Sequence, residues 1–371
     1  QPAGAPDDGL TLSDVWGYGF ELAQGGSLLL DQVTLKIPPP PLAITVSNVD
    51  DSGAGSLRQA LADIGSGGTI SFDPALAGQT IALSSGQLAV DRNVTIDGSA
   101  APGVVVSGSN IVRVLAVTAG VTLSMNDIEV ADGAGAPRGG GILNYGTLNL
   151  NRVVVRDNTE TSAGPANFEF GGGGIYNGDS ATLNLTDSTV ANNTSVNQPG
   201  GGIYGFFNSN LNIVRSTISG NVGGDVAGGL RTLGNLTVTN STIHNNVSAN
   251  WHGGAAFITD GTATFTNSTI TGNTSPDGTA GGLMVATFGA PVSVTVTNSI
   301  VADNGTYNCQ VEGGGAAVLT SGGNNVFTDA SCIPIASDQV VADPGVGPLA
   351  ENGGPTQTQA LLPGSPAIDA A

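Results

Sequence analysis

The stretch GGGGIYNGDSATLNLTDSTVANNTS, residues 171 to 195, holds one complete copy of a phrase that recurs six times between residues 139 and 304. Each copy has a glycine pair, an apolar residue, a short alternating run, Ser or Thr, Ile or Val, and then Asn. The residues after the glycine pairs recur at intervals of 33, 28, 27, 25 and 28 positions; they are Ile142, Ile175, Ile203, Leu230, Ala255 and Leu283. A period of this length indicates a solenoid in which each copy forms one turn.

Each copy also has the pattern of β-strands. Leu183 and Leu185 alternate with polar residues, as in a strand with one buried face, and Val190 follows five residues later. The copies are rich in Gly, Thr, Asn and Val, which disfavour helices and suit strands and turns. The predicted fold class is therefore all-β, a right-handed parallel β-helix.

One Asn closes each copy. Equivalent residues of successive turns stack about 4.7 to 4.9 Å apart in a parallel β-helix, so each Asn amide can donate to one neighbour and accept from the other. We therefore expect a structural Asn ladder, with the members Asn158, Asn193, Asn221, Asn246, Asn273 and Asn304. A second ladder is expected five positions earlier, at Ser188, Ser216, Ser241, Ser268 and Ser299.

The composition limits the classes of partner. The chain has 371 residues, of which 10% are charged and 39% hydrophobic, enough for the narrow core of a solenoid. Its net charge is −20 and Lys36 is its one lysine, so phosphate backbones and anionic membrane surfaces would repel it. No apolar run reaches 18 residues, the least that a membrane-spanning helix needs. We expect no nucleic-acid partner and no membrane insertion.

The two cysteines, Cys309 and Cys332, lie 23 positions apart, close to the length of one turn. A metal pair would need further Cys or His nearby, so the spacing favours a disulfide between adjacent turns. A disulfide favours an oxidising, exported location. The chain opens at Gln1 without a signal-like segment, so either a targeting peptide has been removed or the protein is intracellular. Because the disulfide favours export, we expect an extracellular or cell-surface protein whose signal peptide is absent from this chain.

Both ends of the repeat region resemble a known bacterial group. The segments are ITVSNVDDSGAGSLRQAL at 44–61, TISFDPALAGQTIAL at 69–83, NVTIDG at 93–98 and the ending DPGVGPLAENGGPTQTQALLPGSPAID at 343–369. They resemble secreted β-helix proteins of the choice-of-anchor Q and CSLREA-type group, and the repeats resemble those of polymorphic outer-membrane proteins. The resemblance implies a right-handed β-helix at or outside a bacterial surface, and it implies no reaction. Gly55 stands where the CSLREA phrase has its cysteine.

Three regions are expected along the chain. Residues 42–340 would form the solenoid with a short N-terminal capping helix, because GSLRQALADIG has helical spacing and would cover the open first turn. Residues 341–371 are rich in proline and are predicted to be an irregular C-terminal tail. Residues 1–41 form an N-terminal extension that ends in the stiff polyproline spacer Pro38–Pro41.

The N-terminal extension carries repeat-like sequence ahead of the cap. This segment could pack on its own chain, or it could complete the C-terminal end of a neighbouring chain by strand addition. The second alternative predicts head-to-tail self-association, which generates a filament. The assembly segment, residues 10–37, would use the apolar residues Leu10, Leu12, Phe20, Leu22, Leu28, Leu30, Val33 and Leu35.

An enzyme that degrades polysaccharides is the rival class. A lyase needs a base, cations for the sugar carboxylate and often Ca²⁺ held by clustered Asp, whereas a hydrolase needs two carboxylates. The chain has few cations, and Asp179, Asp187 and Asp225 lie in turn-like contexts. We expect no catalytic residues and no cofactor, with Ca²⁺ as the one alternative. Four arginines could share a face but are expected to be solvated: Arg152, Arg156, Arg215 and Arg231.

Two histidines and a set of aromatic residues remain. His244 and His252 could approach each other, yet without a third ligand they indicate surface residues rather than a metal site. Aromatic residues after the glycine pairs could pack as a ladder or bind a glycan. The glycan-contact candidates are Tyr145, Tyr176, Tyr204 and Phe206. The sequence thus predicts a non-enzymatic extracellular structural or adhesive protein that assembles head-to-tail; the alternative is a carbohydrate-binding or polysaccharide-degrading β-helix.

Overall fold

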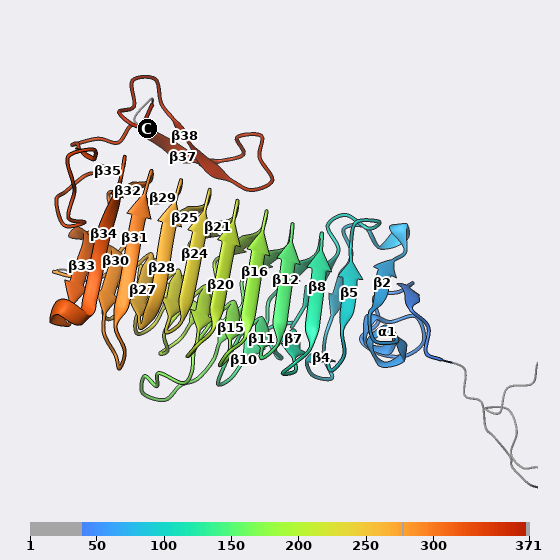
Figure 1. Ribbon diagram of the computed structural model, residues 1–371. Helices are drawn as coiled ribbons and strands as arrows, with labels where there is room; N and C mark the ends of the chain where they lie inside the picture. Colours follow the sequence, from blue (N-terminus) through green and yellow to red (C-terminus); the bar gives the residue numbers. More distant parts are fainter. Residues whose placement is uncertain (1–38, 277, 369–371) are drawn as a thin grey trace, which may run out of the picture. The chain divides into compact units, whose positions relative to one another are not determined.

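The computed structural model describes residues 39–276 and 278–368, which wind into a right-handed parallel β-helix of about 11 turns (Figure 1). The described residues from Pro41 onward form one compact unit. A typical turn contributes one strand to sheet C, one to sheet A and one to sheet B, and equivalent strands of successive turns pair in parallel. The predicted fold class is confirmed. The assembly segment, residues 10–37, lies outside the described residues.

Sheet A runs the length of the solenoid. Its strands are β1 (Ala43–Val46), β2 (Gly68–Phe72), β5 (Val94–Asp97), β8 (Thr122–Asn126), β12 (Thr147–Asn151), β16 (Thr182–Thr186), β20 (Asn210–Val214), β24 (Asn235–Thr239), β28 (Gly261–Thr266), β31 (Val292–Thr297) and β34 (Ala317–Gly323). Sheet B has equally many, shorter strands. They are β3 (Thr80–Ala82), β6 (Val105–Ser107), β9 (Glu129–Ala131), β13 (Val154–Arg156), β17 (Thr189–Ala191), β21 (Thr217–Ser219), β25 (Thr242–His244), β29 (Thr269–Thr271), β32 (Ile300–Ala302), β35 (Val326–Phe327) and β36 (Gln339–Val340).

Sheet C forms the third face of the coil. Its strands are β4 (Leu88–Val90), β7 (Leu115–Val117), β11 (Ile142–Asn144), β15 (Ile175–Asn177), β19 (Ile203–Gly205), β23 (Leu230–Thr232), β27 (Ala256–Thr259), β30 (Ala280–Ala286) and β33 (Tyr307–Glu312). A short sheet D follows sheet B in the middle turns. It contains β10 (Ala134–Gly135), β14 (Thr159–Glu160), β18 (Thr194–Ser195), β22 (Val222–Gly223) and β26 (Val247–Ser248). Two short 3-10 helices, η2 (Pro74–Leu76) and η3 (Gly314–Ala316), complete the solenoid.

The predicted alternating residues line the interior. Leu183 and Leu185 of β16, Val190 of β17 and Ile175 of β15 are all fully buried. The equivalent residues of the neighbouring turns are buried in the same way, so the core is a stack of aliphatic layers. Each such side chain contributes about 1.5 to 3 kcal/mol by its burial.

The register of one turn differs from the alignment of the repeats. Leu230 pairs with Ala256, which in turn pairs with Leu283, so Ala255 is not the core residue of its turn. Ala255 takes the place of Gly229, because its carbonyl accepts from the Leu230 N–H as the Gly229 carbonyl accepts from Ile203. Turns approach closely at this position: a Cβ on Gly229 would lie 2.5 Å from the Ala255 oxygen. This close contact between turns explains why each copy of the phrase has a small residue at this position.

Helix α1 (Leu57–Asp63) covers the first turn, as predicted. Ser56 caps it by accepting a hydrogen bond from the Gln59 N–H, and Leu57 is buried against the core. Gly55 precedes the cap with a φ of +82°. A Cβ there would lie 2.4 Å from the Ser47 hydroxyl, which gives a physical reason for glycine at this position.

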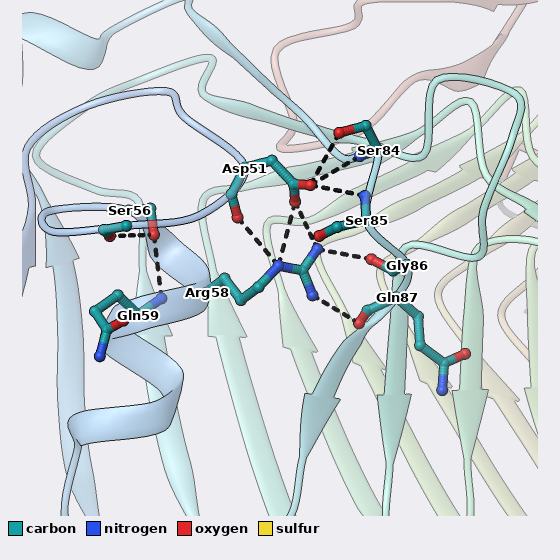
Figure 2. A network of polar contacts seen from close by, with 9 residues as sticks. Asp51, Ser56, Arg58, Gln59, Ser84, Ser85, Gly86 and Gln87 are labelled. Carbon is teal, nitrogen blue, oxygen red and sulfur yellow. Dashed lines mark hydrogen bonds and ion pairs between the residues drawn. The ribbon is translucent and has the colours of Figure 1, made fainter.

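An ion pair ties the cap to a later turn (Figure 2). The Arg58 guanidinium donates to Asp51 Oδ1 at 2.6 Å and to the carbonyl of Gly86 at 2.7 Å. The other oxygen of Asp51 accepts from the backbone N–H groups of Ser84 and Ser85. The loop before α1 is therefore fastened to the segment that leads into β4.

The C-terminal turn contains the predicted disulfide. Cys309 of β33 and Cys332 are bonded, with Cα atoms 4.9 Å apart, and both are buried. Ser331 adds a contact, because its hydroxyl accepts from the Cys309 N–H at 2.9 Å. The disulfide holds the segment after β35 against the last turn of the solenoid.

Residues 341–368 are more regular than the tail that we expected. Strands β37 (Val346–Ala350) and β38 (Thr358–Leu361) pair antiparallel, and Pro348 lies at an irregularity in their register, where proline is tolerated. The Thr217 hydroxyl of β21 donates to the Gln357 carbonyl at 2.6 Å. The hairpin therefore lies against sheet B, several turns back along the solenoid (Figure 1).

Candidate functional site

The Asn ladder lies inside the solenoid, at the turn after sheet B. Asn193 Nδ2 donates to Asn221 Oδ1 at 2.9 Å, and Asn221 Nδ2 donates to Asn246 Oδ1 at the same distance. The hydrogen bonds continue in both directions through all six predicted members, which are all buried. Each amide also donates to a backbone carbonyl, as Asn221 does to Val190. These groups are fully used within the chain, so their role is structural.

The Ser ladder occupies the corner between sheets A and B. The Ser188 hydroxyl accepts from the Val153 N–H and donates to the Thr186 carbonyl, and the Ser188 N–H donates to the next hydroxyl, that of Ser216. The residue before each ladder position has a positive φ, which favours Asn and Asp. The Asn and Asp residues that directly precede ladder positions thus reflect backbone conformation.

Three of the four predicted arginines form ion pairs on the surface. Arg152 pairs with Asp127 at 2.6 Å, and Arg215 pairs with Asp187 at 2.7 Å. Both arginines are about half exposed, at 49% and 50%, as expected for solvated side chains. Arg156 pairs with Glu129 at 2.9 Å. Asp187 is therefore an ion-pair partner of Arg215.

The predicted aromatic residues come together but do not form an open strip. Tyr145, Tyr176, Tyr204 and Phe206 pack as one cluster over sheet C. Tyr176 and Tyr204 are 1% and 0% exposed, so a glycan cannot reach their ring faces in this structure. The Tyr204 hydroxyl donates to the Phe168 carbonyl, and burial raises the pKa of Tyr204 to about 12. The loop 161–170 contacts this cluster through the Phe168 carbonyl.

The parallel register places one outward-facing residue per turn in a column along sheet C. The column contains Leu143, Tyr176, Tyr204, Arg231, Phe257, Met284 and Gln310. Equivalent residues of adjacent strands are close neighbours in a sheet, so Arg231 lies between an aromatic ring on each side. Arg231 is the one charged member of the column.

Arg231 is fully buried, contrary to the solvated position that we expected. Its guanidinium lies 4.3 Å from the centre of the Phe257 ring, a cation–π contact. Nη1 donates to the Thr259 hydroxyl at 2.8 Å and to the Phe257 carbonyl at 3.4 Å. Nε has no hydrogen-bond partner among the described residues, and no ion pair within that part of the chain includes Arg231.

Arg231 lines a cavity of about 380 Å³ that is mostly apolar. Loops from several turns build its walls, and we call it the sheet C pocket. Its lining residues are Ala166, Phe168, Asp225, Val226, Arg231, Trp251, His252, Phe257, Phe288 and Glu312. Phe168 and Phe288 come from loops far apart in the sequence, yet their ring centres are 4.9 Å apart. Trp251 is 58% exposed and Phe288 is 50% exposed, so large aromatic faces remain open to solvent.

The loops that carry these rings are held by hydrogen bonds. One oxygen of the Asp260 carboxylate accepts from the backbone N–H groups of Phe288, Gly289 and Ala290, at 2.9 to 3.2 Å. The Gln198 side chain accepts from the Asn167 N–H at 2.7 Å. Both aromatic walls of the sheet C pocket are therefore positioned in advance of any ligand.

Polar groups in the sheet C pocket lack hydrogen-bond partners in the described part of the chain. Burial raises the pKa of Asp225, although the positive charge of Arg231 acts in the opposite direction. His252 Nδ1 is buried and has no partner in the described part of the chain. A buried polar group without a partner is costly, so such groups in a cavity point to a ligand.

The two histidines lie in different settings. His244 Nδ1 donates a hydrogen bond to the Thr271 carbonyl at 3.0 Å on sheet B, and burial lowers the pKa of His244. His252 lines the sheet C pocket instead. Within residues 39–276 and 278–368, no three His, Cys, Asp or Glu side chains form a group that could hold a metal ion.

A family model described as a right-handed β-helix region matches residues 79–292, more than half of the chain. This protein therefore belongs to the right-handed β-helix family. No curated protein sequence matches it. Among solved structures, the crystal structure of pectate lyase Pel9A is similar over 83% of this chain and 82% of that chain, at 13% identity and a TM-score of 0.46. At that identity the likeness carries no inference about chemistry.

No helix among the described residues has both the length and the apolar character needed to cross a membrane. The sheet C pocket was not predicted from the sequence, in which Arg231, Asp225 and His252 have the pattern of surface or turn residues. One feature of the sequence did indicate the outward-facing column of sheet C. The second residue after each glycine pair is outward-facing, and this position reads Leu, Tyr, Tyr, Arg, Phe and Met from Leu143 to Met284 once the register at Ala256 is corrected.

Proposed function

We propose that this protein is an exported, non-enzymatic adhesive β-helix of the choice-of-anchor Q type that binds a glycan in the sheet C pocket. The observation that carries the proposal is the set of aromatic rings around this pocket: Phe168, Trp251, Phe257 and Phe288. Sugar rings present C–H groups that stack on aromatic faces, while a few polar groups fix their orientation. The disulfide Cys309–Cys332 supports an oxidising location.

A rigid scaffold suits adhesion. Hydrogen bonds to Asp260 and Gln198 hold the loops that form the walls of the pocket, so these walls need not be ordered when a ligand binds. Ordering costs about 0.5 to 1.5 kcal/mol for each immobilised side chain at an interface, and this cost is largely absent here.

The test is the binding of the purified protein to an array of bacterial, plant and animal glycans. We expect binding to a restricted set of glycans, and we expect the double variant Trp251→Ala, Phe288→Ala to lose it. The control variant Tyr307→Ala removes an aromatic residue that is 46% exposed and does not line the pocket, and it should bind normally. Unchanged binding by the double variant would place the glycan site elsewhere.

The same purified protein can be tested for enzymatic activity on polysaccharides. Incubation with polygalacturonate and alginate, with and without Ca²⁺, should yield no unsaturated or reducing-end products. Asp225 and Glu312 both line the pocket, so product formation that Asp225→Asn and Glu312→Gln abolish would identify them as the two carboxylates of a hydrolase.

We also propose that residues 10–37 assemble chains head-to-tail. β34, β36 and β33 are the last strands of sheets A, B and C, so each leaves one edge without a further strand of the described chain. Val318 of β34 is 43% exposed, and Ile333 and Ile335 beyond β35 are 54% and 49% exposed. A second copy's repeat-like segment matches this end in chemistry, because it offers alternating apolar residues and a backbone that can extend the sheets.

A further inference from the structure

We propose that Asn352, in the loop between β37 and β38, is a site of spontaneous deamidation, and that this modification loosens the C-terminal hairpin. The inference does not depend on the glycan binding proposed above. Asparagine deamidates fastest where glycine follows it, because glycine has no side chain to hinder the attack of its own backbone nitrogen. The chain has three such Asn–Gly pairs, at residues 177–178, 304–305 and 352–353.

The structure protects two of the three pairs. Asn177 and Asn304 are 0% and 1% exposed. Asn177 Nδ2 donates to the Ala181 carbonyl at 3.0 Å. The Gly178 N–H donates to the Asn144 carbonyl at 2.7 Å, so neither reacting group of this pair is free. Asn304 belongs to the Asn ladder, whose amides are bonded to neighbouring turns. Attack within either pair would first require local opening of the solenoid.

The third pair, Asn352 and Gly353, is open to attack. Both residues are exposed. The Gly353 N–H donates to no group in the described part of the chain. Gly353 has a φ of +87°, and a Cβ at this position would find no heavy atom within 4 Å apart from those of its chain neighbours. The attacking nitrogen is thus neither bonded nor shielded, and solvent can take up its proton.

The reaction consumes water and releases ammonia. The Gly353 nitrogen gives its proton to hydroxide and forms a bond to Asn352 Cγ, while the Cγ–Nδ2 bond breaks and Nδ2 leaves as ammonia with a proton from water. The product is a five-membered succinimide ring. One water molecule then opens the ring: attack at Cγ gives aspartate, and attack at the backbone carbonyl carbon of Asn352 gives isoaspartate, in which the chain continues through Cγ. Either product carries a carboxylate in place of the amide.

The hairpin loses a hydrogen bond when the amide is replaced. Asn352 Nδ2 donates to the Thr358 carbonyl at 2.8 Å and to the Thr358 hydroxyl at 3.1 Å. A carboxylate has no donor, so the bond to the carbonyl cannot form and the two oxygens repel each other. Thr358 begins β38, next to Gln357, whose carbonyl accepts from Thr217 of sheet B. Deamidation therefore loosens the hairpin where it lies against sheet B.

The test is peptide mass spectrometry of the intact, folded protein after incubation at mildly alkaline pH. Asn352 should convert at least about 10-fold faster than Asn177 or Asn304, because the buried pairs must first open. Aspartate and isoaspartate should both form, and the rate should rise with pH because the attacking nitrogen must lose its proton. Asn352→Gln, whose longer side chain would have to close a larger ring, should show no conversion at this position.

Equal conversion of the three asparagines, or none at Asn352, would overturn the modification site. Aspartate without isoaspartate would show direct hydrolysis by water and overturn the intramolecular attack. The effect on the hairpin is measured separately, by hydrogen exchange of Asn352→Asp. Exchange over residues 346–361 should be about 2- to 10-fold faster than in the unaltered protein, as expected for the loss of one hydrogen bond, with sheet A unchanged. Unchanged exchange in the hairpin would overturn the loosening.

Discussion

Asp51 and Arg58 link the N-terminal cap to the body of the solenoid, with Arg58 Nη2 donating to Asp51 Oδ1 at 2.6 Å (Figure 2). Both side chains are largely shielded, at 13% and 26% exposure. Removing one partner of a shielded ion pair leaves the other without compensation, which costs more than the pair itself contributes. The cap therefore depends on this contact.

We expect Asp51→Ala to lower the free energy of unfolding by about 3 kcal/mol, because Arg58 loses its anion and the Ser84 and Ser85 N–H groups lose their acceptor. Chemical denaturation followed by circular dichroism measures this difference. The control is Asp63→Asn at the end of α1, whose exposed carboxylate accepts from Gln59 and should change stability by less than about 0.5 kcal/mol. Equal losses in the two variants would argue against a special role for Asp51.

The same contact predicts a response to acid. Burial alone would raise the pKa of Asp51, but hydrogen bonds from Arg58, Ser85 and Ser84 outweigh it and hold this pKa well below its usual range. Because the folded pKa lies below the unfolded value of about 3.9, the stabilisation is present above that pH and is lost as the pH falls toward the folded pKa. The difference between the protein and Asp51→Ala should accordingly shrink below about pH 4.

The Asn ladder offers a matched pair of substitutions. Asn221→Ala would remove the acceptor of the Asn193 N–H and amide and the donor to the Val190 carbonyl, all of them buried. We expect a loss of about 3 kcal/mol or more, since each buried group left unsatisfied costs about 1 to 3 kcal/mol. Asn212→Ala removes one hydrogen bond to Asn184 on the half-buried outer face of sheet A and should cost less than about 1 kcal/mol. Similar melting temperatures for the two variants would contradict a structural Asn ladder.

Asp225 and Asp187 should respond to pH with opposite signs. Burial raises the pKa of Asp225, so the folded state binds its proton more tightly than the unfolded state, and stability falls as the pH rises through the folded pKa. Asp225→Asn should therefore raise the melting temperature at pH 7 and have little effect near pH 3. A lower melting temperature for Asp225→Asn at pH 7 would show that the carboxylate is instead stabilised by Arg231.

Asp187 is the reference for this comparison. The hydrogen bond from Arg215 lowers the pKa of Asp187, which outweighs the effect of burial. Its stabilisation is present above the unfolded pKa and is lost as the pH falls through the folded pKa. Asp187→Asn should then lower the melting temperature at pH 7, and the difference should disappear in acid.

Deletion of residues 1–37 tests the assembly proposal. The truncated protein should remain a folded solenoid, because α1 and the first turn lie beyond the deletion, but it should be monomeric. Light scattering and negative-stain microscopy would compare it with the intact chain, which should form filaments. A peptide of residues 10–37 should bind the truncated protein and block assembly of the intact one. An intact chain that is monomeric at every concentration would end this proposal.

The repeat could be recognised in the sequence because each turn buries apolar residues at the same positions. Leu183, Leu185 and Val190 are buried, and so are the equivalent residues of the other copies, because a solenoid has one narrow core that runs its whole length. The repeats were misaligned at Ala255 because alanine fits two kinds of position. It is apolar, like a core residue, and it is also small enough for the close approach between turns at which the preceding turn has Gly229.

The candidate site was harder to foresee. The sequence left open whether Tyr176 and Tyr204 pack as a ladder or bind a glycan, and it gave no sign that both rings are buried or that Tyr204 is bonded to Phe168, in a loop that the repeat does not contain. The sheet C pocket joins Phe168 and Phe288, which are 120 positions apart in the chain. Their contact joins loops from turns that are several strands apart in sheet C, and loop conformation has no periodic signal.

The sequence by itself determined the coil, its interior, the polar ladders, the N-terminal cap and the disulfide, because each depends on local periodicity or on equivalent positions in successive turns. The tertiary structure alone decided that Arg231 is buried beneath aromatic rings, that Asp225 and His252 share its cavity, and that the C-terminal hairpin returns along sheet B. The physical reason is that burial in these places is created by loops and by the hairpin folding back on the solenoid, so the environment of a side chain there depends on residues far away in the sequence.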